Sequence, residues 1–512
     1  MDYASKLYFL QGVPLDNSYT DTLWFDSVGA QTAAFQAKAV AQLIDLWYVR
    51  KGLNGYADIS TPISTIQGCN YVMYQNTSYS DKWYYAFLTN IEYLNDGTTR
   101  IYFETDVIQT YLFDFEFKAS MVEREHVMDD TIGLHTYPEG LEVGEYELDH
   151  ENDSGVLEPS DCVVVMLTSV DPNNPNVIAG SMFQKQYWGC FINVFSDATG
   201  VNDALDKLTE AGKADGVIAL YMVPKSMYNL WSSGSQIGYA EFSQTKYTTS
   251  LGTYTPKNNK LFCYPYNFMY VINNCGASAI YPYENFYISG NSVTFRIYGD
   301  ITPNPSVYIV PTDYLKQSFN YNEKFSLSGF PQCAYNINTY KSWVAQNFGN
   351  ISANLVSNAL NGAMGVVGGV ASGNPVKAAT APIDAMENVF SLVAQAHDVS
   401  VLPPQSKGTL ATSVTYSAGL LDFFFYQAHI KPEYAQIIDS FFDMFGYKVM
   451  TVKEPNRNGR AHWNYVKVPD PKITGNVPYN FLSEIKRIHS NGITYWKNMG
   501  EVGDYSLDNS LS

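Results

Sequence analysis

Apolar and polar residues alternate along much of the first 120 residues, a pattern typical of strands with one buried and one wet face. Two such runs, 83–94 and 100–117, flank Asn95-Asp96-Gly97, whose turn-forming residues predict a hairpin. In the second run we expect Ile101, Phe103, Thr105 and Val107 to face inward. The residues between them, Tyr102, Glu104 and Asp106, are expected to face outward. The pattern predicts strands with one acidic, solvent-facing side.

Three other segments have the composition or the spacing of helices. Residues 33–48 are rich in helix formers and predict one helix packed against the sheet. Apolar residues recur at helical spacing from Pro432 to Phe445, and Gly446 follows as a residue that can end a helix. A second, shorter helix is predicted from about residue 480 to 489, ending near Gly492.

Between about residues 155 and 335, short apolar runs such as 162–167 and 217–223 are broken by Pro, Asn and Gly clusters, which predicts short strands. Aromatic residues alternate here at Phe262, Tyr264, Tyr266, Phe268 and Tyr270, a pattern that favours cross-strand packing over a ligand platform. The chain has 15% aromatic and only 16% charged residues, which argues against disorder and a coiled coil. We therefore predict a mainly β fold with some α (α+β).

One segment does not fit an ordinary globular domain. Residues 342–376 contain no charged side chain, and residues 377–400 contain only Lys377, Asp384, Glu387 and Asp398. The segment reads as two apolar arms, about 20 residues from Trp343 and then 383–397, joined by a Gly/Pro/Ala turn. As a helix rising ~1.5 Å per residue, either arm would approach the ~30 Å of a bilayer core. Neither arm is apolar enough to be an ordinary transmembrane helix.

The polarity of this segment is patterned. Five asparagines at spacings of 3, 4, 4 and 3 share one helix face, and small residues form a ridge that allows close helix packing. The expected pore-lining residues are Asn347, Asn350, Asn354, Asn358 and Asn361, and the expected helix-packing residues are Gly365, Gly369 and Gly373. The expected membrane-inserting residues are Phe348, Ile351, Leu355, Val356, Leu360, Met364, Val366, Val367, Val370, Val389, Phe390, Leu392 and Val393.

Two interpretations of this hairpin stay open. A helix that lies on a membrane surface usually has Lys or Arg on its polar face, and the neutral face here favours oligomerisation around a polar lumen. The alternative is a helical hairpin buried in the protein core. An exposed apolar hairpin would aggregate, so in either case the segment must be covered.

The acidic charge is concentrated at one end of the sequence. The net charge is −19, of which residues 1–170 carry −18, residues 171–400 carry −2 and residues 401–512 carry +1. This acidity predicts either a solubilising surface or a surface that repels a polyanion. Nucleic acid, if it is a partner, is therefore not held by clustered Lys and Arg.

No pattern indicates enzyme chemistry, a cofactor or a metal. The six cysteines form no C-x-x-C pair and are expected to be buried free thiols. Glu125, His126, Asp130 and His135 lack metal-ligand spacing, and we expect them in a solvated acidic loop. Gly212-Lys213 lacks the rest of a phosphate-binding loop, and the N-terminus lacks the features of a secretory signal.

Blocks of residues near both ends give the chain a family resemblance. It resembles the tail knob, or distal tail tube, proteins of short-tailed bacteriophages of the picovirus type. The blocks are Val13-Pro14-Leu15, Thr22–Phe25, Lys82–Phe87, Phe103–Thr110, Arg124–Val127, Glu139–Leu141, Phe441-Phe442, Gly446–Lys448, Trp463–Val466, Asn491–Thr494 and Tyr505-Ser506.

The resemblance implies a homohexameric tube at the tip of the virion tail, assembled in the host cytoplasm, through which the genome leaves. It implies tube-wall β-barrels from residues 1–155 and 409–512, a β-rich knob insertion at 156–335 and a hydrophobic loop at 336–408. The loop would plug the tube and then form a pore in the host cytoplasmic membrane.

The implied partners are an upstream tail or collar protein, double-stranded genomic DNA that passes without specific binding, the membrane, and a cell-wall component. A receptor-binding tail protein and a cell-wall-degrading tail enzyme are the alternative functions.

Overall fold

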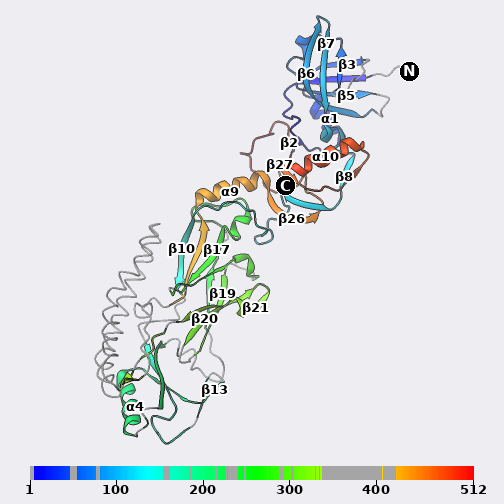
Figure 1. The fold of residues 1–512 in the computed structure, drawn as a ribbon. Helices are drawn as coiled ribbons and strands as arrows, with labels where there is room; N and C mark the ends of the chain where they lie inside the picture. The colour runs from blue at the N-terminus through cyan, green and yellow to red at the C-terminus, as the bar shows by residue number, and fades with distance from the viewer. Residues whose placement is uncertain are drawn as a thin grey trace. The chain divides into compact units, whose positions relative to one another are not determined.

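The computed structural model divides the chain into two compact units (Figure 1). Unit 1 comprises Met1–Glu142, Lys257–Lys260 and Gln436–Ser512, and unit 2 comprises Val143–Pro256 and Leu261–Ala435. The structure describes residues 5–46, 55–76, 81–153, 162–178, 180–183, 186–211, 213, 216–225, 228, 240–246, 249–273, 275–287, 292–300, 305–328, 330–333, 335–336, 406–407 and 422–511. These residues form mainly β-strands with a few helices, as predicted.

The N-terminal part of unit 1 is a six-stranded antiparallel sheet. Its order is β3 (Ala39–Leu46), β1 (Ser5–Leu10), β5 (Tyr71–Asn76), β6 (Trp83–Asn95), β7 (Thr98–Thr105) and β4 (Tyr56–Ile59). The predicted hairpin is confirmed as β6 and β7, which pair from Asn95↔Thr98 to Ala86↔Thr105. The turn falls at Asp96-Gly97, so the local sequence determines this element.

The predicted second strand is too long. The chain leaves β7 at Thr105, forms helix α3 (Val107–Tyr111), and then enters the short strand β8 (Phe115–Phe117). Asp106, expected on the outward face, is 1% exposed, and its carboxylate accepts hydrogen bonds from the backbone N–H groups of Ile108 (3.1 Å) and Gln109 (3.0 Å). Because Asp is a strong N-cap residue, it starts a helix where the alternation predicts a strand.

The predicted helix over residues 33–48 is also wrong in its second half. Helix α1 (Val28–Gln36) begins at Ser27, whose hydroxyl accepts from the backbone N–H of Ala30 (3.2 Å), and ends before strand β3. In β3, Leu43 lies opposite Leu7 of β1 and Ala41 lies opposite Phe9. Sheet pairing therefore overrides the helix propensity of this segment.

The six-stranded sheet has apolar clusters on both faces. One cluster contains buried or partly buried residues from all six strands, among them Leu7, Leu43, Ala57, Val72, Ala86 and Phe103, so the sheet curls around it. The other contains Tyr71, Met73, Tyr85 and Phe87 together with residues of α1 and α3. Trp463, Ile485 and Trp496, from the far end of the sequence, belong to the same second cluster.

The second sheet of unit 1 combines strands from both ends of the chain. Its order is β2 (Asp21–Leu23), β29 (Ile493–Trp496), β27 (Trp463–Lys467), β9 (Ser120–Glu125) and β26 (Tyr447–Lys453), and β8 pairs separately with β28 (Ile473–Gly475). The two predicted C-terminal helices are confirmed as α9 (Pro432–Phe445) and α10 (Tyr479–Asn491). Gly446 and Gly492 follow them with φ of +65° and +99°.

Unit 2 is built from small antiparallel sheets. A four-stranded sheet has the order β10 (Tyr146–Asp153), β25 (Phe424–Ile430), β17 (Asn267–Ile272) and β18 (Ser278–Tyr281). A five-stranded sheet contains β16 (Ala240–Thr245), β19 (Ser292–Asp300), β20 (Ser306–Tyr314) and β21 (Gln317–Phe319), with β22 (Phe325–Ser328) also paired to β20. A three-stranded sheet has the order β14 (Phe191–Phe195), β11 (Cys162–Thr168) and β15 (Val217–Pro224), and β12 (Ser181–Phe183) pairs with β13 (Gln186–Trp188).

The predicted runs 162–167 and 217–223 are confirmed as β11 and β15, which pair with each other. Their sheet is buried on both faces, with helix α4 (Ala198–Glu210) on one side and the large core of unit 2 on the other. The expected strand through the alternating aromatics is wrong in its first half, because Phe262 ends the 3-10 helix η3 (Asn259–Phe262) and β17 starts only at Asn267. Tyr270 does lie opposite Tyr426 of β25, as cross-strand packing predicts.

Candidate functional site

The predicted membrane-active residues lie outside the described residues. This holds for the expected membrane-inserting, pore-lining and helix-packing side chains, all of which fall between residues 347 and 393. Of the helices that the structure does describe, none has both the length and the hydropathy needed to span a bilayer. The described residues do, however, include both ends of the predicted loop.

The two ends of this loop meet. Strand β23 (Tyr335–Asn336) pairs antiparallel with β24 (Ser406–Lys407), in the register Tyr335↔Lys407 and Asn336↔Ser406. The chain therefore leaves unit 2 at residue 336 and returns beside it at residue 406. The two ends of the segment 337–405 are thus held side by side by this pairing, which forms the base of the segment.

The nearest described segments before β23 and after β24, apart from the base itself, belong to sheets of unit 2. Before it, residues 331–333 follow the edge of β15, because the Met222 N–H donates to the Pro331 carbonyl (2.9 Å) and the Cys333 N–H donates to the Leu220 carbonyl (2.7 Å). After it, β25 is the second strand of the four-stranded sheet, between β10 and β17, and all its residues are buried.

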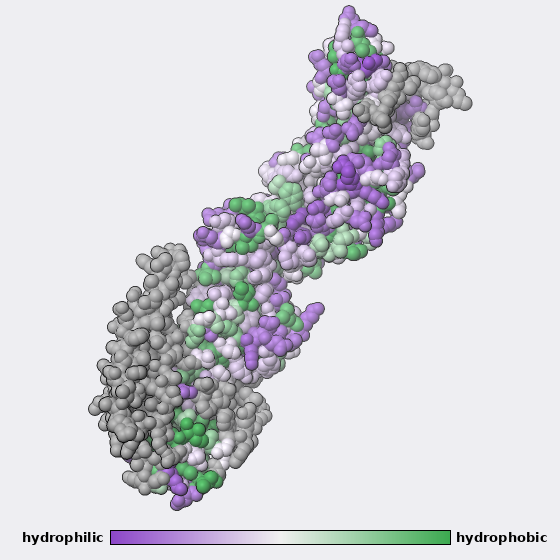
Figure 2. Space-filling view, in the orientation of Figure 1, coloured by the Kyte–Doolittle hydropathy of each residue, from purple (hydrophilic) through white to green (hydrophobic). Residues whose placement is uncertain are grey.

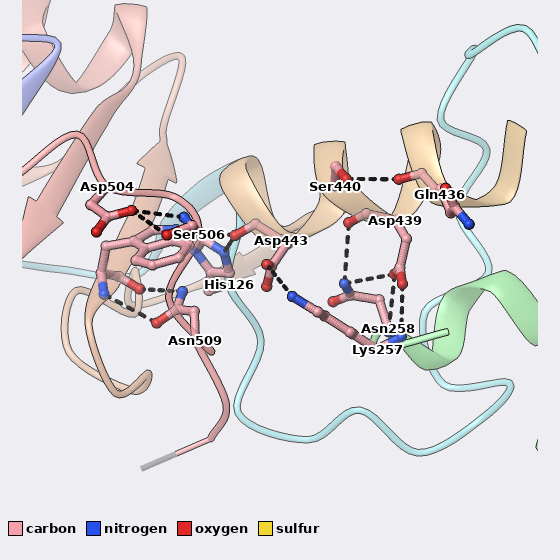
Figure 3. A network of polar contacts seen from close by, with 11 residues as sticks. His126, Lys257, Asn258, Gln436, Asp439, Ser440, Asp443, Asp504, Ser506 and Asn509 are labelled. Atoms are coloured by element: carbon pink, nitrogen blue, oxygen red, sulfur yellow. Dashed lines mark hydrogen bonds and ion pairs between the residues drawn. The ribbon is translucent and has the colours of Figure 1, made fainter. Parts of the chain in front are cut away.

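A polar network in unit 1 holds a short segment of the middle of the chain (Figure 3). The Asp439 carboxylate of α9 accepts from the backbone N–H groups of Lys257 (2.7 Å) and Asn258 (3.1 Å), and from the Asn258 side-chain amide (2.9 Å). The ammonium group of Lys257 lies 3.4 Å from the Asp443 carboxylate. Residues 257–260 are thereby bound to α9 although most of their sequence neighbours belong to unit 2.

A buried ion triad completes the attachment of this segment. The Glu139 carboxylate pairs with both Arg124 and Lys260, and the three side chains are 1%, 12% and 4% exposed. The Lys260 ammonium also donates to the Tyr137 carbonyl (2.9 Å). A buried charge is costly unless it is paired, so each member of the triad depends on the others.

The cluster expected in a solvated acidic loop is only partly solvated. Glu125 and His126 are buried (0% and 2% exposed), whereas His135 is half-buried. Asp130 accepts hydrogen bonds from the Asn259 N–H (2.9 Å) and the Tyr447 hydroxyl (2.7 Å), and burial raises its pKa. These residues attach the loop that follows β9 to β26 and to residues 257–260. The sequence pattern does not reveal this role.

His126 is held as a neutral side chain. Its Nδ1 accepts from the Tyr465 N–H (2.8 Å), and its Nε2 donates to the Asp443 carbonyl (2.9 Å). Burial lowers the pKa of His126 to about 3, and the neighbouring Arg460 and Arg124 add to the effect. Both ring nitrogens are therefore occupied, and within the described ranges no group of three His, Cys, Asp or Glu side chains is placed to hold a metal ion.

Folding spreads the acidic charge more evenly than the linear sequence suggests. Unit 1 contains 19 basic and 27 acidic residues, a net −8, and unit 2 contains 12 and 23, a net −11. Lysines near the C-terminus neutralise N-terminal carboxylates, as in Lys467–Glu123 (2.9 Å) and Lys453–Glu125 (2.5 Å). The view in Figure 2 shows extensive hydrophilic areas on unit 1.

Some carboxylates of unit 1 are left for an electrostatic role. Asp16, Asp26, Asp81, Asp96 and Glu104 are exposed, and the structure gives none of them a Lys or Arg partner among the residues it describes. They lie on or next to the six-stranded sheet and its connections. They are the candidates for a surface that repels a polyanion.

Comparisons with known proteins agree on one family. Residues 227–510 match the C-terminal domain of the tail knob protein gp9 of Bacillus phage phi29, and residues 3–116 match the N-terminus of caudoviral major tail proteins. Over the full length, the chain is 26% identical to tail knob protein gp9 of phage phi29 and 27% identical to that of phage PZA, with 99% of both chains covered in each case.

A solved structure shares the fold. The tail knob protein gp12 of bacteriophage C1 superposes with a TM-score of 0.61 at 12% sequence identity, covering 99% of this chain and 100% of that one. The predicted resemblance is thus confirmed by sequence over both units and by fold. The chain belongs to the family of structural phage tail knob proteins represented by gp9 of Bacillus phage phi29.

Proposed function

We propose that this tail protein forms the wall of a hexameric tube through which double-stranded genomic DNA leaves the virion, and that residues 342–400 enter the host cytoplasmic membrane to form a pore. The observation that carries the proposal is the base at β23 and β24, which holds the two ends of the segment 337–405 side by side. Within it, residues 342–376 are uncharged and carry the five asparagines at helical spacing, which suits a lumen-facing hairpin.

The tube-wall part of the proposal rests on unit 1. Its first 116 residues match caudoviral major tail proteins, and its six-stranded sheet curls around a shared apolar cluster. The second sheet joins strands from residues 21–23 and 493–496, consistent with a wall contributed by both terminal parts. We propose that six copies close the wall and that an upstream tail or collar protein continues it.

Fewer carboxylates are left to repel DNA than the sequence alone suggests. Paired carboxylates such as Glu123 and Glu125 are neutralised locally, so they contribute little to a field in the lumen. The exposed carboxylates of unit 1 without basic partners would repel phosphates if they face the lumen. DNA would then slide because no cluster of cations binds it.

Leakage from liposomes tests the membrane part. We expect the full chain to release a dye from vesicles of bacterial lipids. Leu360→Asp or Val366→Asp should reduce leakage strongly, because a charge at the centre of a membrane helix costs about 2.5–3.5 kcal/mol. Ile178→Asp is the matched control, since Ile178 is 82% exposed and lies outside the segment.

A second pair of substitutions separates insertion from conduction. Replacing Asn354 and Asn358 by Leu should preserve vesicle binding while it reduces the passage of DNA through the pore. Undiminished leakage in both Asp variants would refute the membrane role. Native mass spectrometry of the assembled protein tests the hexamer, and another stoichiometry would refute that part.

A further inference from the structure

The five-stranded sheet of unit 2, which contains β19, β20 and β21 (Figure 1), has two chemically different faces. Its inner face is apolar and joins the core through residues such as Phe295, Ile309 and Leu327. Its outer face alternates with these positions and carries hydroxyl, aromatic and paired charged groups, namely Glu241, Ser243, Thr294, Arg296, Tyr298, Tyr308, Ser326 and Ser328.

Three tyrosines on this face are in contact with one another. The rings of Tyr298 and Tyr308 are stacked, with centroids 5.7 Å apart and planes inclined by 23°. The ring of Tyr321 lies 5.8 Å from that of Tyr298, and its hydroxyl donates to the Tyr298 hydroxyl (3.2 Å). Tyr321 is 51% exposed and Tyr298 only 8%, so Tyr321 presents the accessible ring of the row and Tyr298 supports it from the side of the sheet.

Polar groups surround these rings in defined positions. The Arg296 guanidinium donates to the Glu241 carboxylate (2.5 Å) and lies 3.8 Å from the centre of the Phe319 ring. The hydroxyls of Ser243 and Thr294 are hydrogen-bonded to each other (2.8 Å) on the neighbouring strands. Planar donors and acceptors therefore stand beside aromatic surface on one flat face.

We propose that this face binds a saccharide chain. A pyranose ring presents apolar C–H groups that pack on tyrosine rings, and its hydroxyls pair with the Ser, Thr, Arg and Glu groups around them. An apolar protein partner would need a larger exposed apolar patch. A polyanion would need a cluster of cations, whereas Arg296 is neutralised by Glu241, and Lys324, 5.3 Å from the centre of the Tyr308 ring, does not make a cluster by itself. The site is independent of the proposed pore, because it involves no residue of 337–405.

Binding by the full chain tests the proposal with two probes. The first probe is a soluble glycan strand prepared from bacterial cell wall, and the second is poly(glycerol phosphate), which has hydroxyls but no sugar rings. We expect the glycan to bind and Tyr321→Ala to weaken it about tenfold, the effect of losing one aromatic contact. Tyr321→Phe should retain binding because it keeps the ring.

Tyr479→Ala is the control, since Tyr479 is 85% exposed on α10 of unit 1. Three results would overturn the proposal. They are no binding of the glycan, equal or tighter binding of poly(glycerol phosphate), and equal weakening by Tyr321→Ala and Tyr479→Ala. Tyr321 lies in a short surface turn, η5 (Tyr321–Glu323), so its replacement leaves the core of the sheet intact.

Discussion

Unit 1 should lose stability as the pH falls from 7 to 5, because two buried histidines are held neutral. Burial lowers the pKa of His126 to about 3 and that of His489 to about 4, whereas an unfolded histidine has a pKa of 6.5. Like His126, His489 makes a hydrogen bond through each of its ring nitrogens. Its Nδ1 is bonded to the Ile485 carbonyl (2.7 Å) and its Nε2 to the Tyr495 hydroxyl (2.7 Å). Below pH 6.5, the unfolded chain gains protons that the folded chain cannot accept.

The magnitude follows from these values. A depressed pKa gives stability that is present above the unfolded pKa and is lost as the pH falls toward the folded one. Between pH 7 and pH 5, each histidine should remove about 2 kcal/mol from the free energy of unfolding, at about 1.4 kcal/mol per pH unit below 6.5.

Asp106 acts in the opposite direction. Burial raises its pKa to about 6, so the cost of its ionised form is relieved as the pH falls, which restores about 1 kcal/mol over the same range. The expected net loss from the three groups is about 2–3 kcal/mol, and the raised pKa values of Asp130 and Asp443 reduce the loss further in the same way as Asp106.

The assay is urea unfolding at pH 7 and pH 5, read by pulsed hydrogen exchange of peptides that cover β27, so that it reports on unit 1. In His126→Gln, the loss between the two pH values should shrink by about 2 kcal/mol, whatever the stability of the variant at pH 7. His135→Gln is the control, because His135 is only half-buried and hydrogen-bonds through Nε2 to a loop carbonyl. An unchanged pH dependence in His126→Gln would refute the assignment of a neutral, buried ring.

Two further substitutions, each with a control, test contacts inside unit 1. Lys260→Met leaves Glu139 without one of its buried partners and should cost about 3–5 kcal/mol in the same unfolding assay, whereas Lys118→Met, at an exposed pair, should cost about 0–1 kcal/mol. Gly446→Ala would place a Cβ 2.1 Å from the Glu125 carbonyl oxygen at a φ of +65°, and should cost more than about 2 kcal/mol by thermal unfolding. Gly503→Ala, with a φ of +87° but nothing within 4 Å, should cost only about 1 kcal/mol, and equal losses would contradict the clash.

Elements set by neighbouring residues could be predicted from the sequence. The β6–β7 hairpin follows from Asn95-Asp96-Gly97 between two alternating runs, and α9 follows from apolar spacing that ends at Gly446. The helix predicted over residues 33–48 fails because β1, some 30 residues earlier, pairs with its second half. Local propensity cannot register a partner at that distance.

The hydrogen bonds and ion pairs that hold residues 257–260 could not be predicted from the sequence. Asn258 and Asp439 are 181 residues apart, and Lys260 and Glu139 are 121 residues apart. Nothing in the sequence around Lys260 distinguishes a lysine in a buried triad from one on the surface. The expected site residues 347–393 remain predictions, and the liposome experiment bears on them directly.

The parallel pairing of β2 with β29 has a consequence for synthesis. Thr22 lies beside Tyr495, so the second sheet of unit 1 cannot be completed until nearly 500 residues have left the ribosome. Unit 2 lies wholly between these strands in the sequence and can fold first, because its last strand, β25, ends at residue 430. A chain interrupted after residue 435 would thus contain all of unit 2 but lack β26, β27 and β29, without which the second sheet of unit 1 cannot form.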